Sequence, residues 1–379
     1  MRNTLSQYWN KIQGNLFPTL EEELPPLTQK QQQFISILEM TRIEEFVPAF
    51  CQGYRGRPIK NRKAIACAFI AKAVYNIPTT TMLIDRLRSD ISLRRICGWE
   101  TIRQMPSESS FSRAFAEFAE SKLADKVHEF LIKQAYKGKI VLHAITDSAA
   151  IRAREKPVVK EPKPPKKEKK ARAKKGEPTL KDQTRIEIQF RGDMPLDEML
   201  KELPNVCDVG AKTNSKGHLS YWIGYKLQLT VEDEGVPLTG FTCSASLNDS
   251  QAAIPMAQLT AQRVVSLYDL MDGGYYAERI IQHSISLGHV PIIDKPAKGE
   301  AQAYEKQQEK LAQETLKWKP PHLIRYEKRT TVERTFSRLR DEFGANFVRV
   351  RGALKVGAHL MFGVLALTAD QLLKIAGSG

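Results

Sequence analysis

The chain has 379 residues, an apolar fraction of 42% and a formal net charge of +15 at pH 7. This length allows two or three domains with their own cores, and the composition is that of an ordinary soluble globular protein. The positive charge suits a polyanionic partner, and DNA or RNA is favoured. The most apolar run, residues 360–368, is too short to span a bilayer, and residues 1–10 lack a signal-peptide core. We therefore expect no membrane partner.

The five cysteines are scattered, which disfavours a zinc site or a disulfide framework and favours a reducing cytoplasm. We expect each of them to be a small buried side chain. The seven histidines lack the spacing of metal ligands, so a zinc hydrolase is also disfavoured.

Residues 1–135 are predicted to form a helical N-terminal domain. Apolar residues recur there at helical spacing, as at Phe111, Phe115 and Phe118, and Ser107 is predicted to cap the helix that carries them. Residues 79–120 fit a helix-turn-helix that would read the major groove with this helix, where Arg113 is the one basic residue. A structural or dimer-forming domain is the alternative.

The pattern changes at Lys139. Residues 140–146 are apolar and rich in β-branched side chains, which predicts a buried strand that ends at Asp147. A basic disordered linker, residues 155–182, is predicted to follow residues 139–154. Its first 21 residues, 155–175, hold nine Lys, one Arg and three Glu, a net charge of +10 − 3 = +7. We expect this linker to contact DNA without sequence preference.

Strands and helices alternate in the remainder, residues 183–379, which together with residues 139–154 are predicted to form the catalytic domain. The predicted strands cover residues 221–231, 236–243, a short segment ending at 271–272, and 290–293; the predicted helices cover residues 250–265, 275–287, 299–317 and 356–375.

Two aspartates, Asp147 and Asp272, follow predicted strands, at the rim of a sheet where ligands bind in α/β folds. Glu333 lies on a later helix that could pack beside that rim. Three carboxylates brought together repel each other unless a cation neutralises them, and Mg²⁺ accepts carboxylate and phosphate oxygens. Taken singly, Asp272 is typical of a turn and Asp147 of a helix cap, so the prediction depends on all three acids.

Basic residues surround Glu333. At 3.6 residues per turn, Tyr326, Arg329, Glu333 and Arg340 fall on one helix face, beside an apolar stripe. Arginines around a lone acid suit phosphate binding, although a solvated basic face is the plainer interpretation. The other arginines in this stretch are Arg334 and Arg338, and the apolar stripe consists of Val332, Phe336, Leu339 and Phe343.

This stretch resembles the DDE transposases of bacterial insertion sequences, in the group whose last acid lies in a Y-x2-R-x3-E-x6-K pattern. Tyr326, Arg329 and Glu333 match the pattern, and Arg340 stands in the lysine position and keeps its charge. The family's second acid occurs in D-x-G-Y, which residues 272–275 match, and its first acid follows an apolar strand, as Asp147 does.

The resemblance also extends to the N-terminal part, in residues 56–58, 93–98 and 106–113. The chain departs from some relatives in one respect. Those relatives carry a large β-rich insertion before the glutamate, whereas here residues 295–325 form a short polar segment, so hairpin chemistry tied to that insertion is not implied.

The resemblance implies an RNase H-like α/β fold, with a mixed five-stranded sheet flanked by helices and preceded by an all-α N-terminal domain. It implies that Asp147, Asp272 and Glu333 hold two Mg²⁺ ions, roughly 3.5–4 Å apart, with Mn²⁺ as a substitute. The implied reaction cuts DNA at the ends of the element and joins the freed 3′-hydroxyl to target DNA, without a covalent protein–DNA intermediate.

Tyr326, Arg329 and Arg340 would then hold phosphates near the scissile bond. Lys295 is a further candidate for phosphate contact and Trp318 for base stacking, although packing is the plainer role for Trp318. The implied partners are double-stranded terminal repeats, target DNA and a second copy of the chain in the synaptic complex. We expect a cytoplasmic, nucleoid-associated bacterial protein.

Two alternatives stay open: a DNA-binding regulator that cuts nothing, and an RNase H-like nuclease without strand transfer.

Overall fold

The structure is a computed structural model, and it describes residues 26–48, 61–159, 184–192, 194–213, 218–295, 297, 299–346 and 348–377. The chain divides into two compact units, one formed by Met1–Lys137 with Thr335–Gly379 and the other by Gly138–Arg334. The predictions for residues 56–58 and for most of the basic linker lie outside the described residues.

The first unit is all-helical within the described residues, and local sequence explains where its helices begin. Thr28 closes a capping box with Gln31, and the side chains of Asn61, Thr79 and Asp90 accept hydrogen bonds from the first turns of three further helices. The elements are α3 (Gln29–Thr41), α4 (Ile43–Phe46), α5 (Arg62–Val74), α6 (Thr80–Ser89), α7 (Ile91–Ile96), η1 (Ile102–Gln104), α8 (Glu108–Glu120), α9 (Leu123–Ala135) and α17 (Ala353–Gly377).

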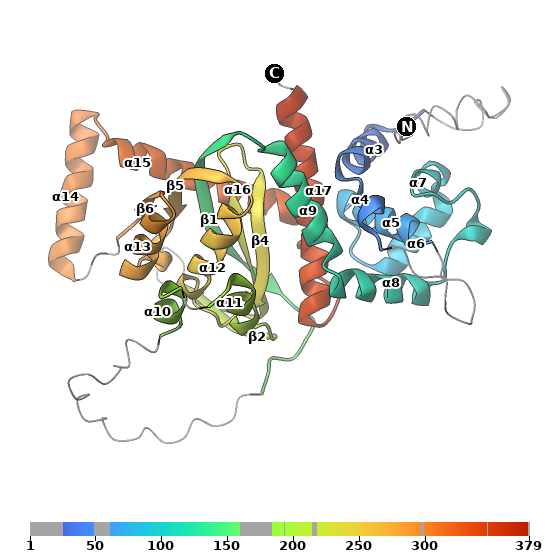
Figure 1. Cartoon of the computed structure of the whole chain (residues 1–379), viewed down its shortest axis with the longest axis horizontal. Coiled ribbons are helices and arrows are strands. Elements are labelled where there is room, and N and C mark those ends of the chain that lie inside the picture. Colours follow the sequence, from blue (N-terminus) through green and yellow to red (C-terminus); the bar gives the residue numbers. More distant parts are fainter. Residues whose placement is uncertain are drawn as a thin grey trace. The chain divides into compact units, whose positions relative to one another are not determined.

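The closing helix α17 is the core helix of this unit. It packs against α3, α5, α8 and α9, as Figure 1 shows for α9. The helix is long and apolar enough to cross a membrane, but 78% of its apolar window is buried inside the protein, as expected of a core helix. The sequence predicted a buried helix here; the structure groups it with the N-terminal helices, whereas the sequence placed it in the catalytic domain.

The second unit is built on a mixed sheet with the strand order β2-β3-β1-β5-β6, and β4 pairs with β3 beyond β2. The central strand β1 runs antiparallel to β3 and parallel to β5, and β5 runs parallel to β6. The strands are β1 (Ile140–Arg152), β2 (Asp208–Thr213), β3 (Leu219–Val231), β4 (Pro237–Ser244), β5 (Val265–Met271) and β6 (Val290–Ile293).

Gly224 marks the point on β3 where its partner changes from β2 to β4. Its φ is +151°, and a Cβ there would lie 2.1 Å from the carbonyl oxygen of Ile151. Only glycine fits this close approach of β3 to β1.

One face of the sheet carries an apolar core shared with short helices. Met271 at the end of β5 packs there with Tyr275, Ile254 and Met199, all of them buried. Figure 1 shows α12 against the sheet, with α13 beside β6. The helical elements of this unit are α10 (Arg185–Phe190), α11 (Leu196–Glu202), α12 (Ser250–Ala261), η2 (Gly273–Tyr275), α13 (Glu278–Ser286), α14 (Glu300–Leu316), α15 (Pro321–Tyr326), η3 (Glu327–Arg329) and the first part of α16 (Thr330–Asp341).

The predicted mixed α/β class, with a helical region before it, is confirmed, and two details are corrected. Within the described residues the sheet has six strands rather than five, because β2 adds an edge strand that the sequence did not predict. The first strand does not end at Asp147 but continues to Arg152, because β3 pairs with it beyond that point, from Asp147↔Leu229 to Arg152↔Gly224.

Candidate active site

The strand register brings Asp147 and Asp272 to the same level of the sheet. Thr146 on β1 pairs with Met271 on β5 in parallel, and each aspartate is the next residue. Because adjacent strands lie about 4.8 Å apart and side chains alternate between faces, the two carboxylates belong to one face. Backbone pairing therefore places Asp147 and Asp272 side by side, at the same level of two neighbouring strands.

Asp147 is held in a largely buried position. Its carboxylate accepts a hydrogen bond at 2.7 Å from the backbone N–H of Ser148, and its side chain is 14% exposed. Burial, together with the negative charge of Asp272, raises the pKa of Asp147 to about 6, although the hydrogen bond from Ser148 and the charges of Lys212 and Arg329 act in the opposite direction. Two carboxylates repel each other in a partly buried site, and a bound cation would reduce this repulsion.

The residues after Asp272 explain the D-x-G-Y pattern. Asp272 caps η2, and its Oδ1 atom accepts a hydrogen bond from the N–H of Gly274 at 2.9 Å. Tyr275 is fully buried, and its hydroxyl donates to Oε1 of Gln228 on β3 at 2.9 Å. The glycine thus orients the carboxylate, and the tyrosine fixes the turn to the sheet.

Arg329 connects the third acid to the first. Its Nη2 atom donates to Oε1 of Glu333 at 2.9 Å, and its Nη1 atom lies 3.6 Å from Oδ2 of Asp147. The guanidinium also lies 5.9 Å from the ring centre of Tyr326. Burial and the charge of Asp272, among other groups, act on Tyr326 as well, whose pKa is raised. Arg329 is therefore the point at which Tyr326, Asp147 and Glu333 meet.

The donors at this point are carboxylate oxygens, which suit a hard divalent cation. Among the described residues, no group of three or more His, Cys, Asp and Glu side chains is gathered closely enough to hold a metal ion. Glu333 is linked to Asp147 through Arg329. The two aspartates offer oxygen atoms of the kind that such a cation takes, whereas the carboxylate of Glu333 is engaged by Arg329.

The other predicted DNA contacts lie in different settings. Arg338 is bound at 2.9 Å to Glu342 and at 2.6 Å to Asp370, which occupies its guanidinium inside the first unit. The remaining residues are at least partly accessible to a ligand. Arg334, Lys295 and Arg113 are exposed, and Arg334 donates a hydrogen bond to Thr330. Arg340 is half-buried, and Trp318 is 60% exposed instead of packed.

Two charged residues beside the acids were missed by the sequence analysis. Asp294 follows β6, and the register Met271↔Ile293 places it next to Asp272. The signal that pointed to the other aspartates, an acid directly after a buried strand, was present for it too. Lys212 on β2 is close enough for its charge to lower the pKa of Asp147, but no sequence signal marks it.

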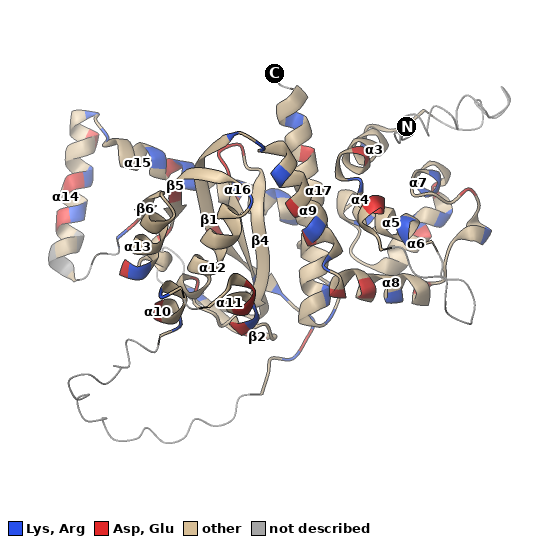
Figure 2. Ribbon diagram, viewed as in Figure 1, with Lys and Arg blue, Asp and Glu red and all other residues tan. Residues whose placement is uncertain are grey.

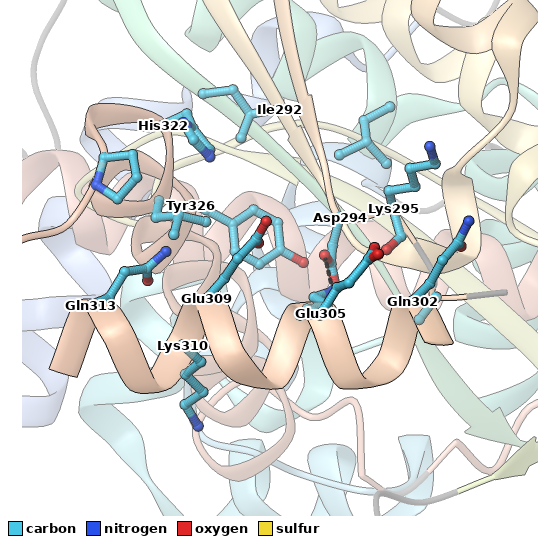
Figure 3. A pocket seen from close by; sticks show the side chains of 15 residues that line it. Ile292, Asp294, Lys295, Gln302, Glu305, Glu309, Lys310, Gln313, His322 and Tyr326 are labelled. Carbon is cyan, nitrogen blue, oxygen red and sulfur yellow. Dashed lines mark hydrogen bonds and ion pairs between the residues drawn. The ribbon is translucent and has the colours of Figure 1, made fainter. Parts of the chain in front are cut away.

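A pocket of about 840 Å³ opens beside this site, between α14, α15 and the end of β6. Figure 3 shows Tyr326, Asp294 and Glu305 around it, with Lys310 pointing away. Lys306 of α14 ties the helix to this edge by an ion pair with Asp294 at 2.5 Å. Acidic and basic residues alternate along α14, as Figure 2 shows, so the pocket has no uniform charge.

Comparison with known protein families gives two matches. Residues 140–369 match the family described as "Transposase DDE domain", and residues 18–117 match the family described as "Transposase domain (DUF772)". No curated protein and no solved structure matches the chain. The first match covers more than half of the chain and includes every predicted catalytic acid.

Proposed function

Since the chain belongs to the family of transposases with a DDE domain, we propose that it cuts DNA at the ends of an insertion sequence and joins the 3′-hydroxyl to target DNA. Membership in the family supports a DNA transposase. The observation that carries the finer proposal is the placement of Asp147 and Asp272 side by side, with Arg329 linking Asp147 to Glu333.

In this proposal Asp147, Asp272 and Glu333 hold divalent cations, Mg²⁺ or Mn²⁺. When bound, such ions stabilise negative charge on the attacking and leaving oxygens of a phosphodiester. The chain's own part is to keep the acids in place: Ser148 fixes one carboxylate and Gly274 the other through backbone hydrogen bonds. With a pKa of about 6, Asp147 is still mostly ionised at neutral pH, and a bound cation would compensate the charge that burial disfavours.

Arg329 and Tyr326 would contact a phosphate that is held at the acids. A guanidinium can bind a phosphate through two parallel hydrogen bonds. Arg340 follows Glu333 on the same helix by seven residues, about two turns, and would hold a phosphate farther along. Arg334, Lys295, Trp318 and Arg113 remain proposed DNA contacts. Arg338 is better explained as a structural residue, because two acids already bind it.

The partners proposed are the terminal repeats, the target duplex and a second copy of the chain. Residues 79–120 remain the proposed reader of the terminal repeat. They fold as α6, α7, η1 and α8, and Arg113 is exposed on α8.

The test is cleavage and joining of a plasmid that carries the DNA flanking the gene. Asp147→Asn, Asp272→Asn and Glu333→Gln should each abolish Mg²⁺-dependent nicking and keep DNA binding. Asp197→Asn, on an exposed residue of α11, is the matched control and should cut like the parent. Cutting without joining would identify a nuclease, and specific binding by the parent without any cutting would identify a regulator.

A further inference from the structure

A second pocket lies on the face of the sheet that carries the acids. It has a volume of about 490 Å³ and is lined by the apolar residues of β6, by Pro321, and by Tyr268, His322 and Arg325. None of the described residues that line it is acidic. The larger pocket beside α14 differs in this respect, because acids and lysines are mixed there.

Arg325 is the charged group of this pocket. Its guanidinium lies 4.6 Å from the ring centre of Tyr268, and its Nη1 atom makes one long hydrogen bond, 3.4 Å, to the carbonyl oxygen of Pro321. In the part of the chain that the structure describes, its Nε atom is buried without an acceptor, and no Asp or Glu forms an ion pair with it. A half-buried arginine normally has an anionic partner, because burial of an uncompensated charge is unfavourable.

The stack on Tyr268 fixes the orientation of this guanidinium. A cation over an aromatic face is stabilised by the ring quadrupole, and the arginine loses side-chain freedom before any ligand arrives. The ring of His143 also lies 5.3 Å from the ring of Tyr268, and His143 is bound at 2.6 Å to Asp233. Tyr268, in contact with His143 on the neighbouring strand, therefore pre-positions the guanidinium.

The pocket and the acids lie on the same face of the sheet. Asp272 directly follows β5 in extended conformation, four residues after Tyr268, so the two share a face and lie about 13 Å apart at 3.3 Å per residue. Arg325 precedes Arg329 by four residues along α15 and η3. A separation of 13 Å corresponds to about four nucleotides of a DNA strand at 3.4 Å each.

We propose that Arg325, stacked on Tyr268 and aided by His322, binds a backbone phosphate of the DNA duplex a few nucleotides away from the scissile bond. The pocket supplies one cation and apolar walls, which suit a phosphate with its sugar. The ligand belongs to DNA instead of a free nucleotide because the pocket shares its sheet face with the acids and its helix leads directly to Arg329. This inference rests on the proposed function, because the position of the scissile bond at the acids determines where the DNA strand runs.

The experiment measures binding of a fluorescent duplex of about 30 base pairs, without divalent metal, at salt from about 50 to 200 mM. Each phosphate contact contributes about 0.9 to the slope of log affinity against log salt. Arg325→Gln should lower that slope by about 1 and weaken binding roughly five- to tenfold near 100 mM salt. Arg325→Lys, which keeps the charge, should restore most of the slope. Lys201→Gln, on an exposed residue of α11, is the charge-matched control and should bind like the parent.

An unchanged slope in Arg325→Gln, in a protein that melts like the parent, would overturn the proposal. Tyr268→Leu provides the second variant: it keeps the charge and removes the stack, and should weaken binding with little change of slope. Competition with dAMP separates the sources of phosphate. Binding of dAMP that depends on Arg325, with DNA binding unaffected, would assign the pocket to a nucleotide and overturn the DNA contact.

The binding measurement is independent of catalysis, because the assay contains no divalent metal ion. A chain that binds DNA through Arg325 but never cuts would contradict the proposed function alone. A chain that cuts but whose DNA affinity is indifferent to Arg325 would contradict this inference alone.

Discussion

The Nη1 atom of Arg329 lies 3.6 Å from Oδ2 of Asp147, while Nη2 of the same guanidinium donates to Glu333. One arginine thus compensates two of the three acids that we propose as metal ligands. We also propose that this guanidinium binds a phosphate of the DNA, so a bound cation and the arginine would compete for the same carboxylates.

Arg329→Gln should therefore separate two effects. Without the guanidinium the carboxylates lose a competing cation, so Mn²⁺ should bind the DNA-free protein more tightly, as measured by isothermal titration calorimetry. Cleavage should nevertheless fall, roughly 100-fold, because the phosphate loses a positioned cation. Arg329→Lys is the control and should bind Mn²⁺ like the parent. Weaker Mn²⁺ binding by Arg329→Gln would show that the arginine organises the acids instead of competing for them.

Asp147→Asn should stabilise the metal-free protein at pH 8. The folded-state pKa of about 6 lies above the usual value of 3.8, so the ionised carboxylate opposes folding above pH 6 and this penalty disappears as the pH falls toward 4. The difference corresponds to roughly 3 kcal/mol as an upper value. Urea unfolding at pH 8 and pH 4 measures it, with Asp197→Asn as the exposed control. An equal stabilisation at both pH values would exclude this electrostatic origin.

Gly274→Ala should impair cleavage more than stability. A Cβ at this position would lie 3.0 Å from Oδ1 of Asp272, the atom that the N–H of residue 274 holds. A displaced carboxylate should slow nicking by about 10- to 100-fold. The melting temperature should stay close to that of the parent, because residue 274 is exposed. Gly377→Ala, where nothing lies within 4 Å, is the control. Full activity in Gly274→Ala would mean that Asp272 tolerates the shift.

Arg338→Ala should destabilise the protein without a specific loss of DNA binding. It removes hydrogen bonds to the carboxylates of Glu342 and Asp370, which together cost roughly 1.5–3 kcal/mol or more. Hydrogen bonds from Arg338 lower the pKa of Glu342, and bonds from Gln33, Lys374 and Arg338 lower that of Asp370 despite its burial. This stabilisation is present above about pH 4.5 and is lost as the pH falls, so the difference in unfolding free energy should shrink by pH 3.

The DNA affinity of folded Arg338→Ala at pH 7.5 provides the decisive comparison. It should equal that of the parent, whereas Arg334→Gln, which removes an exposed arginine of the same helix, should bind less tightly. A reduced salt slope in Arg338→Ala would return Arg338 to the DNA-contact residues.

Much of the fold could be predicted because it depends on local pattern. The β-branched run at residues 140–146 and the strands at 221–231 and 290–293 lie where periodicity placed them. The apolar stripe of α16, from Val332 to Phe343, is buried as predicted. The edge strand β2 was not predictable in this way. Its sequence, DVGAKT, has few apolar residues, and it is a strand only because β3 offers it a pairing edge.

The candidate site shows the same division. Strand ends pointed to Asp147 and Asp272, and the helical stripe pointed to Glu333 and Arg329. The identical signal at Asp294 was overlooked. The burial of Arg338 among acids and the exposure of Trp318 carry no local signature, because both depend on which segments pack beside them.

The sequence by itself determined which residues we propose for the chemistry: two acids after strands, a third on a basic helix, and the motifs that mark the family. Only the tertiary structure decided how they meet. Strand register, which long-range hydrogen bonds fix, aligns Asp147 with Asp272, and chain packing brings Arg329 to Asp147. Local propensity acts over a few residues, whereas these contacts join residues more than a hundred positions apart, so no periodicity in the sequence can encode their distances.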